Sequence, residues 1–249
     1  MKYDVIVLGS GPGGYVTAIR ASQLGLKTAI IEREELGGIC LNWGCIPTKA
    51  LLKSANVFEY IQHADAYGIK VSSSEADFGA MVGRSRDVAD GMSKGVTFLL
   101  KKNKVDVIMG SGKVLTGKRI EVKANDGGTQ VLEASNIIIA TGARSRELPN
   151  LKQDGKKIIG YREALTLKTQ PKKMVVVGSG AIGVEFAYFY NAIGTDVTVV
   201  EYMDSIVPVE DKEIGKQLGR SLKKQGMSLE RELELIFFEP GDPLSHLPP

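Results

Sequence analysis

The fold is decided by the segment Tyr3-Asp4-Val5-Ile6-Val7-Leu8-Gly9-Ser10-Gly11-Pro12-Gly13-Gly14 near the start of the chain. Its apolar first half predicts a strand, and the helical pattern of residues 15–26 follows the glycines directly. Gly9, Gly11 and Gly14 have the spacing of a dinucleotide-binding turn. Such glycines permit a tight bend, a close approach of the backbone to a pyrophosphate, and close packing of the helix on the strand.

A second apolar run, residues 27–31, ends on Glu32, which lies eighteen residues after Gly14. A carboxylate at this point can accept hydrogen bonds from the hydroxyl groups of a ribose. Glycine-rich turns are common on their own. Strand, glycines, helix, strand and acid in this order, however, predict a nucleotide-binding unit.

The same unit occurs a second time further along the chain. Residues 173–177 predict a strand, Gly178, Gly180 and Gly183 repeat the glycine spacing, and Glu201 again lies eighteen residues after the last glycine. A duplication kept only for structural reasons would need neither the three glycines nor the acid. The chain is therefore predicted to bind two nucleotides.

The two cysteines of the sequence, Cys40 and Cys45, are five positions apart. Opening a disulfide ring this small returns little loop-closure entropy, which suits a dithiol that cycles better than a structural staple. Pro47 is suited to the first turn of a helix, so Cys45 is expected at a helix N-terminus, where the helix dipole favours a thiolate. From the spacing alone, a buried and inert pair is an equally good interpretation.

Four motifs together resemble the flavin-dependent pyridine nucleotide–disulfide oxidoreductases, from residue 1 to about residue 226. They are GSGPGGY at residues 9–15, GGICLNWGCIPTKALL at 37–52, ATG at 140–142 and GSGAIGVEF at 178–186. The resemblance is strongest to the branch that oxidises dihydrolipoamide. It implies an α/β fold of the FAD/NAD(P)-binding, Rossmann-like, three-layer type, with two nucleotide-binding units of which the second is truncated.

By this resemblance, Cys45 is the thiol next to the flavin and Cys40 is the thiol that exchanges with the substrate. Lys49 lies near the flavin and pairs with Glu185. The alternatives for these two residues are a surface lysine on an amphipathic helix and an exposed helical carboxylate.

The cofactors implied are FAD and NAD, and no metal site is predicted. Since a carboxylate at Glu201 repels the 2′-phosphate of NADP, and no arginine occurs between Glu201 and Val209, NAD is favoured over NADP. The predicted FAD contacts are Gly9, Gly11, Pro12, Gly13, Gly14, Glu32, Arg33, Gly38, Lys49, Gly112, Thr141 and Gly142. The predicted NAD contacts are Gly178, Gly180, Ile182, Gly183 and Glu201.

The implied function is the oxidation of protein-bound dihydrolipoamide to lipoamide, with electrons passing through the cysteine pair and FAD to NAD. The implied partners are the lipoyl groups of 2-oxo acid dehydrogenase complexes or of the glycine cleavage system, and a second copy of the chain in a homodimer. The alternatives are a related disulfide reductase of the mercuric or glutathione type, and a non-catalytic flavin-binding fragment.

Composition and charge exclude other classes of function. A net charge of +3 with dispersed basic residues argues against nucleic-acid binding. No apolar stretch approaches the roughly 20 residues of a membrane span, and a strand that begins at residue 3 leaves no room for a targeting peptide. Because a single pair of cycling cysteines fits a reducing compartment, the expected location is the cytoplasm.

The predicted domains are an FAD-binding domain over residues 1–145 without its return segment, a truncated NAD-binding domain over 146–226, and an atypical tail over 227–249. The tail shows no motif of the family, and we expect a truncated or frame-shifted reading there. The family's acid/base pair, a histidine and a glutamate, is also missing, since neither His63 nor His246 has its sequence context. We therefore expect these 249 residues alone to be a poor catalyst.

Residues 1–72 predict a βαβα unit with both thiols on its second helix, and the segments between the other motifs predict simple elements. Residues 77–102 predict one long helix, although four glycines weaken it. Residues 105–139 predict a β-meander with a hairpin near Asp126-Gly127, and residues 142–169 a connection with a short helix around 162–167.

Overall fold

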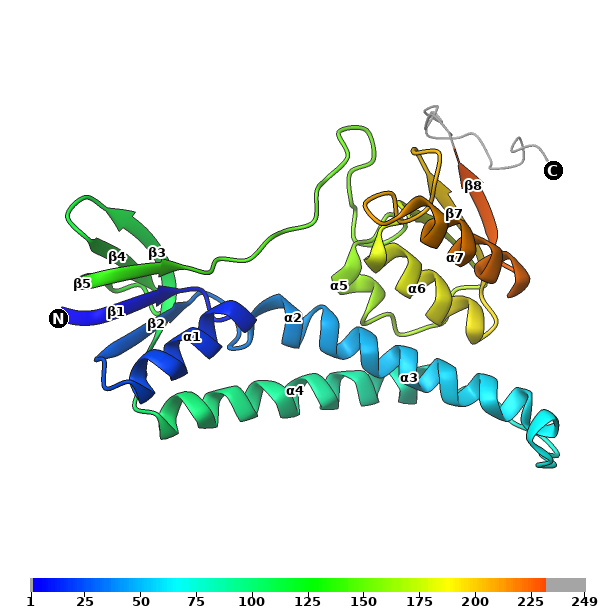
Figure 1. The fold of residues 1–249 in the computed structure, drawn as a ribbon, viewed down its shortest axis with the longest axis horizontal. Coiled ribbons are helices and arrows are strands. Elements are labelled where there is room, and N and C mark those ends of the chain that lie inside the picture. The colour runs from blue at the N-terminus through cyan, green and yellow to red at the C-terminus, as the bar shows by residue number, and fades with distance from the viewer. Residues whose placement is uncertain (1, 232–249) are drawn as a thin grey trace. The chain divides into compact units, whose positions relative to one another are not determined.

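The computed structural model describes residues 2–231, which divide between two compact units (Figure 1). Unit 1 consists of residues 1–51 and 79–146, and unit 2 of residues 52–78 together with the chain from residue 147 onward. The chain passes from one unit to the other inside helix α3, Cys45–Gln62, and returns at the start of helix α4, Phe78–Lys102. The predicted tail from residue 232 on, with His246, lies outside the described residues.

Unit 1 is built on five strands that close on themselves, in the order β1-β2-β3-β4-β5, with β5 pairing back to β1. Strands β5, β1, β2 and β3 are parallel neighbours, whereas β4 is antiparallel to both β3 and β5. The bounds are β1 Lys2–Leu8, β2 Thr28–Glu32, β3 Asp106–Leu115, β4 Arg119–Ala124 and β5 Thr129–Ile139.

The closure depends on two long strands that each change partner along their length. The first residues of β3 pair with β2, and from Gly110 onward β3 pairs with β4. Strand β5 pairs first with β4 and then with β1. A Cβ at Gly110 would lie 2.5 Å from the carbonyl oxygen of Lys123, so glycine is needed where β3 changes its partner.

Three layers result, because the parallel strands are covered on both faces. Val5 and Val7 of β1 pack in a cluster with residues of α1, Pro12–Gln23, and of α4. Ile6 and Leu8 point to the opposite face and pack with residues of β4. Burial on both faces explains why the first strand is apolar almost throughout.

Unit 2 contains a three-stranded parallel sheet in the order β6-β7-β8. Its strands are β6 Lys173–Val177, β7 Asp196–Glu201 and β8 Ser228–Arg231. Its helices are the short 3₁₀ helix η1 Ala64–Tyr67, α5 Tyr161–Ala164, α6 Ala181–Ala192 and α7 Lys212–Lys224. Strand β8 lies inside the predicted tail and extends the sheet next to β7.

The core of unit 2 is aromatic. The ring of Tyr190 packs edge-on against Phe189 and lies 6.0 Å from Phe78, the residue at which α4 begins. The fully buried hydroxyl of Tyr190 donates a hydrogen bond to the carbonyl oxygen of Ala164 at 2.6 Å. Burial raises the pKa of this tyrosine well above its ordinary value, so the hydroxyl stays a neutral donor.

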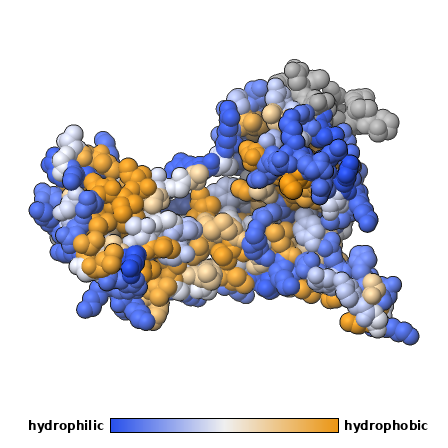
Figure 2. Space-filling model, in the orientation of Figure 1, coloured by the Kyte–Doolittle hydropathy of each residue, from blue (hydrophilic) through white to orange (hydrophobic). Residues whose placement is uncertain are grey.

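Large apolar side chains of the unit 1 strands remain exposed within the described part of the chain. Figure 2 shows hydrophobic surface over these strands. The exposed residues there include Val107, Met109, Val114, Val131 and Ile139. Apolar surface of this kind is typical of a contact face.

Most elements predicted from the sequence are confirmed, including the long helix α4, the meander with its turn at Asp126-Gly127, and the duplicated strand–helix–strand units. The first helix is an exception, because it begins at Pro12 and ends at Gln23 instead of covering residues 15–26. Proline at the first helical position is favourable, since its missing N–H would have no partner in the helix.

The third glycine of the first unit is expected to tolerate no side chain. In the Gly14→Ala variant a Cβ would lie 1.9 Å from the carbonyl oxygen of Gly9, so the helix must move off the strand. We expect a loss of about 3 kcal/mol or more in the free energy of unfolding, measured in urea without added nucleotide.

Gly13→Ala is the matched control, because a Cβ at Gly13 would meet nothing within 4 Å. Alanine is favoured over glycine in a helix by roughly 0.5–1 kcal/mol, so this variant should be at least as stable as the parent chain. Equal losses in the two variants would contradict the packing argument.

Candidate redox and nucleotide-binding sites

The first glycine loop has the form that a pyrophosphate needs. Gly9 has a φ of +98°, and a Cβ there would lie 2.3 Å from the carbonyl oxygen of Ala140. Gly14 packs against Gly9 and brings α1 close to β1. At Gly11 and Gly13, by contrast, a Cβ would meet nothing within 4 Å, so the backbone at the helix N-terminus is open to a ligand. Helix N-termini bind phosphates through free N–H groups and the helix dipole, and the residues therefore fit FAD.

Glu32 ends β2 as predicted, and its carboxylate is held at this loop. One carboxylate oxygen, Oε2, accepts hydrogen bonds from the amide and the hydroxyl of Ser10, at 2.9 and 2.7 Å. The other oxygen, Oε1, accepts from the amides of Arg33 and Glu34, at 2.8 and 2.9 Å. Glu32 is only 8% exposed, and these four donors satisfy its buried charge.

The second glycine loop repeats this arrangement. Gly178 has a φ of +96°, a Cβ at Gly183 would lie 2.1 Å from the carbonyl oxygen of Gly178, and a Cβ at Gly180 would meet nothing within 4 Å. Glu201 ends β7, and its Oε2 accepts from the amide and the hydroxyl of Ser179 at 2.7 and 2.6 Å. These residues fit NAD by the same argument.

The carboxyl group of Glu201 stays ionised at neutral pH. Burial raises its pKa, but hydrogen bonds from the Ser179 hydroxyl and from backbone amides, including that of Met203, outweigh this effect. The net result is a pKa below the ordinary value of 4.5. Such hydrogen bonds favour the charged form because they weaken when the group is protonated.

The cysteine pair forms a disulfide, with Cα atoms 4.7 Å apart. Cys45 is the first residue of α3, as predicted. Cys40 does not share that helix but lies on a separate short helix, α2, Gly38–Asn42, so the prediction of both thiols on one helix is wrong. On a continuous helix, residues five apart are about 7.5 Å apart along the axis, beyond disulfide reach.

The disulfide segment is attached to the first glycine loop. The amide of Gly37 donates to the carbonyl oxygen of Ser10 at 3.1 Å. Gly38 has a φ of +61°, and a Cβ there would lie 2.8 Å from the Cα of Gly11. The start of the redox segment therefore lies directly on the loop that fits FAD.

An arginine outside the predicted site residues holds the turn between the cysteines. Arg86 of α4 donates from Nη1 to the carbonyl oxygen of Asn42 at 2.6 Å, and its guanidinium lies 4.5 Å from the ring centre of Trp43. A lone arginine in a long helix gives no sequence signal for such a role.

The remaining predicted site residues are spread over several elements of both units. Lys49 is exposed on α3, one turn after Cys45, and Glu185 is half-buried on α6. Thr141 and Gly142 follow Ala140, whose carbonyl abuts Gly9. Pro12 begins α1, Ile182 lies exposed in the first turn of α6, and a Cβ at Gly112 would lie 2.5 Å from Leu8 Cδ1. The pairing of Lys49 with Glu185 stays a prediction.

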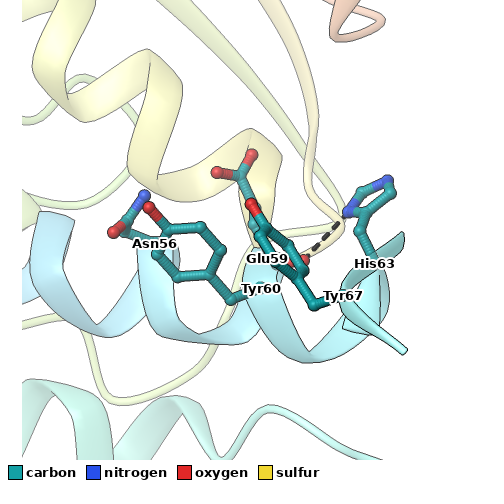
Figure 3. A pocket seen from close by; sticks show the side chains of 5 residues that line it. All are labelled: Asn56, Glu59, Tyr60, His63 and Tyr67. Carbon is teal, nitrogen blue, oxygen red and sulfur yellow. Dashed lines mark hydrogen bonds between the residues drawn. The ribbon is translucent and has the colours of Figure 1, made fainter. Parts of the chain in front are cut away.

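His63 lies outside the glycine loops, just after α3, beside a pocket of about 260 Å³ in unit 2 (Figure 3). Its Nδ1 is 2.9 Å from the carbonyl oxygen of Glu59, one helical turn earlier, so the ring caps its own helix. The Glu59 carboxylate accepts a hydrogen bond from the hydroxyl of Tyr188. Burial and this contact raise the pKa of Tyr188 to about 12. The Glu59 carboxylate is therefore hydrogen-bonded to a neutral tyrosine and not to His63.

Between residues 2 and 231 there is no group of three or more histidine, cysteine, aspartate or glutamate residues that could hold a metal ion. In the same range no helix is both long and apolar enough to cross a membrane.

The chain belongs to the pyridine nucleotide-disulphide oxidoreductase family, which it matches over residues 3–234. It is 49% identical to a dihydrolipoyl dehydrogenase of Zymomonas mobilis, over 96% of this chain and 52% of that one. A dihydrolipoyl dehydrogenase of Rhizobium etli is 50% identical, over 96% and 53%. Among solved structures, LpdA from Mycobacterium tuberculosis superposes with a TM-score of 0.83 at 30% identity, over 93% and 51%.

These similarities confirm the α/β Rossmann-like fold and the resemblance inferred from the motifs. Dihydrolipoyl dehydrogenases are flavin-dependent disulfide oxidoreductases that use FAD and NAD. The chain spans about half the length of the curated relatives it matches.

The ionised state of Glu201 should make stability depend on pH. Because the pKa of the folded state lies below 4.5, this carboxyl adds stability above that pH, and the contribution is lost as the pH falls through the lower folded value. The advantage of the parent chain over Glu201→Gln in the free energy of unfolding should therefore shrink between about pH 7 and about pH 3.5.

Urea unfolding at a series of pH values measures this difference. Glu210→Gln, which changes an exposed carboxylate after the same strand, is the matched control. A gap between parent chain and Glu201→Gln that stays constant with pH would contradict the assignment.

Proposed function

We propose that this chain carries the redox disulfide, the FAD site and the NAD site of a dihydrolipoyl dehydrogenase, which oxidises protein-bound dihydrolipoamide to lipoamide. The observation that carries the proposal is the position of the Cys40–Cys45 disulfide. Its segment begins directly on the glycine loop that fits a flavin nucleotide, through Gly37 and Gly38. A disulfide with a purely structural role would not need to lie next to a nucleotide-binding loop.

The two proposed nucleotide sites follow the two glycine loops. Residues 1–145 bind FAD through the first glycine loop and Glu32, and residues 146–226 bind NAD through the second glycine loop and Glu201. The proposed site residues also include Arg33, Lys49, Gly112, Thr141 and Gly142 for FAD, and Ile182 for NAD. When bound, FAD supplies an acceptor for two electrons from the dithiol and a hydride donor for NAD.

The proposed exchange takes place at the cysteines. One thiolate of a dihydrolipoyl group attacks Sγ of Cys40, forms a mixed disulfide, and releases Sγ of Cys45 as a thiolate. The second substrate thiolate attacks the substrate sulfur of that disulfide, closes the lipoyl ring, and releases Cys40. Two electrons pass to the cysteine pair, and two protons leave the substrate dithiol.

The position of Cys45 supports its role as the leaving thiolate. It is the first residue of the 18-residue helix α3, so the positive end of the helix dipole acts on its sulfur. Both cysteines are at least partly exposed in the chain, which leaves the disulfide open to a substrate thiolate. Lys49 is proposed to lie near the flavin, paired with Glu185.

The wider setting is part of the same proposal. The partners proposed are the lipoyl groups of 2-oxo acid dehydrogenase complexes or of the glycine cleavage system, and a second copy of the chain in a homodimer. The proposed location is the cytoplasm, because a single pair of cycling cysteines fits a reducing compartment better than a secreted scaffold.

The reductive half of the reaction tests this function without requiring turnover. After reconstitution with FAD, dihydrolipoamide should bleach the visible flavin absorption of the parent chain in the absence of air, and glutathione should not. Cys40→Ser and Cys45→Ser should each slow this bleaching by about a thousandfold or more, because each removes a reacting sulfur.

Dithionite provides the control, since it reduces flavin without the cysteines and should bleach all three proteins equally. Fast bleaching of either cysteine variant by dihydrolipoamide would contradict the proposed pathway. A parent chain that responds to glutathione and not to dihydrolipoamide would favour a glutathione-type reductase.

Cofactor choice gives an independent test. The Glu201 carboxylate should repel the 2′-phosphate, so NAD should bind the parent chain at least about tenfold more tightly than NADP in calorimetric titration. Glu201→Gln should narrow that ratio by removing the charge. A parent chain that prefers NADP would contradict the assignment.

A further inference from the structure

The serine between the first two glycines of each loop is completely buried and makes the same two hydrogen bonds to a glutamate in both units. The amide and the hydroxyl of Ser10 both donate to Oε2 of Glu32, and those of Ser179 both donate to Oε2 of Glu201. The two sets of distances agree to within 0.2 Å, at 2.9 and 2.7 Å against 2.7 and 2.6 Å. The hydroxyl of Ser10 also accepts the amide of Gly37 at 3.2 Å.

Each serine also accepts a backbone hydrogen bond from the segment that follows its glutamate. The carbonyl oxygen of Ser10 accepts the amide of Gly37 at 3.1 Å, and that of Ser179 accepts the amide of Val207 at 3.0 Å. In both units, therefore, one residue links the glycine loop, the acid at the end of the second strand, and the chain beyond it.

The serine hydroxyl is needed because the carboxylate is buried. Glu32 and Glu201 are each 8% exposed, so little water reaches them, and a lost donor would not be replaced easily. Backbone amides after the strand hold the opposite oxygen of each carboxylate. The side chain is thus fixed from two sides at the edge of the glycine loop.

We propose that Ser10 and Ser179 are positioning residues for nucleotide binding, each acting through its glutamate on the adenosine ribose of one cofactor, FAD for Ser10 and NAD for Ser179. This inference rests on the proposed function. Neither hydroxyl needs to touch the nucleotide, because the carboxylate is the group that meets the ribose.

The two units serve as controls for each other. Ser179→Ala should weaken the binding of NAD about tenfold and leave the binding of FAD unchanged, whereas Ser10→Ala should do the reverse. Both affinities are measured by calorimetric titration of the 249-residue chain with FAD and with NAD. Ser85→Ala is a further control, because Ser85 is equally buried but donates to the carbonyl oxygen of Val82 within α4. It should change neither affinity.

A double variant separates positioning from a general effect on folding. If Ser179 acts only through Glu201, then adding Ser179→Ala to Glu201→Gln should weaken NAD binding no further than Glu201→Gln alone. Full additivity would overturn the proposal, and so would serine variants that bind like the parent chain or that lose both nucleotides together. These results would leave the proposed function standing. A parent chain that binds neither FAD nor NAD would overturn the proposed function and this inference with it.

Discussion

Both units depend on one close contact, in which the third glycine of a loop packs its Cα on the carbonyl oxygen of the first. A Cβ at Gly14 or Gly183 would lie about 2 Å from that oxygen, so the contact exists only because the side chain is absent. It sets each helix directly against the strand that precedes it. The open amides of the helix then lie at the carboxyl end of the sheet, where parallel α/β folds bind their ligands.

The redox segment of unit 1 uses this loop as its support. Short helix α2 begins on the loop backbone, and the turn between the cysteines is fixed by Arg86 from α4. A disulfide that opens and closes needs a frame that does not change with it, and here the main chain around it is held by the loop backbone and by the Arg86 side chain. Catalytic groups placed on rigid elements keep their geometry through the reaction.

The sequence predicts the parts of this site that local patterns encode, and misses those that depend on distant residues. Glycine spacing and a terminal acid locate both strand–helix–strand units, because the whole pattern lies within one local segment. Nothing local shows that β3 and β5 change partners and close the sheet, or that residues 52–78 join unit 2. The links from serine to glutamate span 22 positions and become visible only once the strand and the loop are side by side. The serine that recurs in both glycine motifs is the single feature of the sequence that points to these links.

The pairing of β5 with β1 has a consequence for how the chain folds. Lys2 pairs with Glu133, so β1 receives one of its two neighbours only after β5, about 130 residues further along the chain, has been synthesised. Contacts this distant in sequence form slowly, because loop-closure entropy must be lost before any contact is gained. Until then β1 has an open edge that can pair with other chains. Unit 1 therefore completes its native sheet late, and β1 needs protection until β5 has been synthesised.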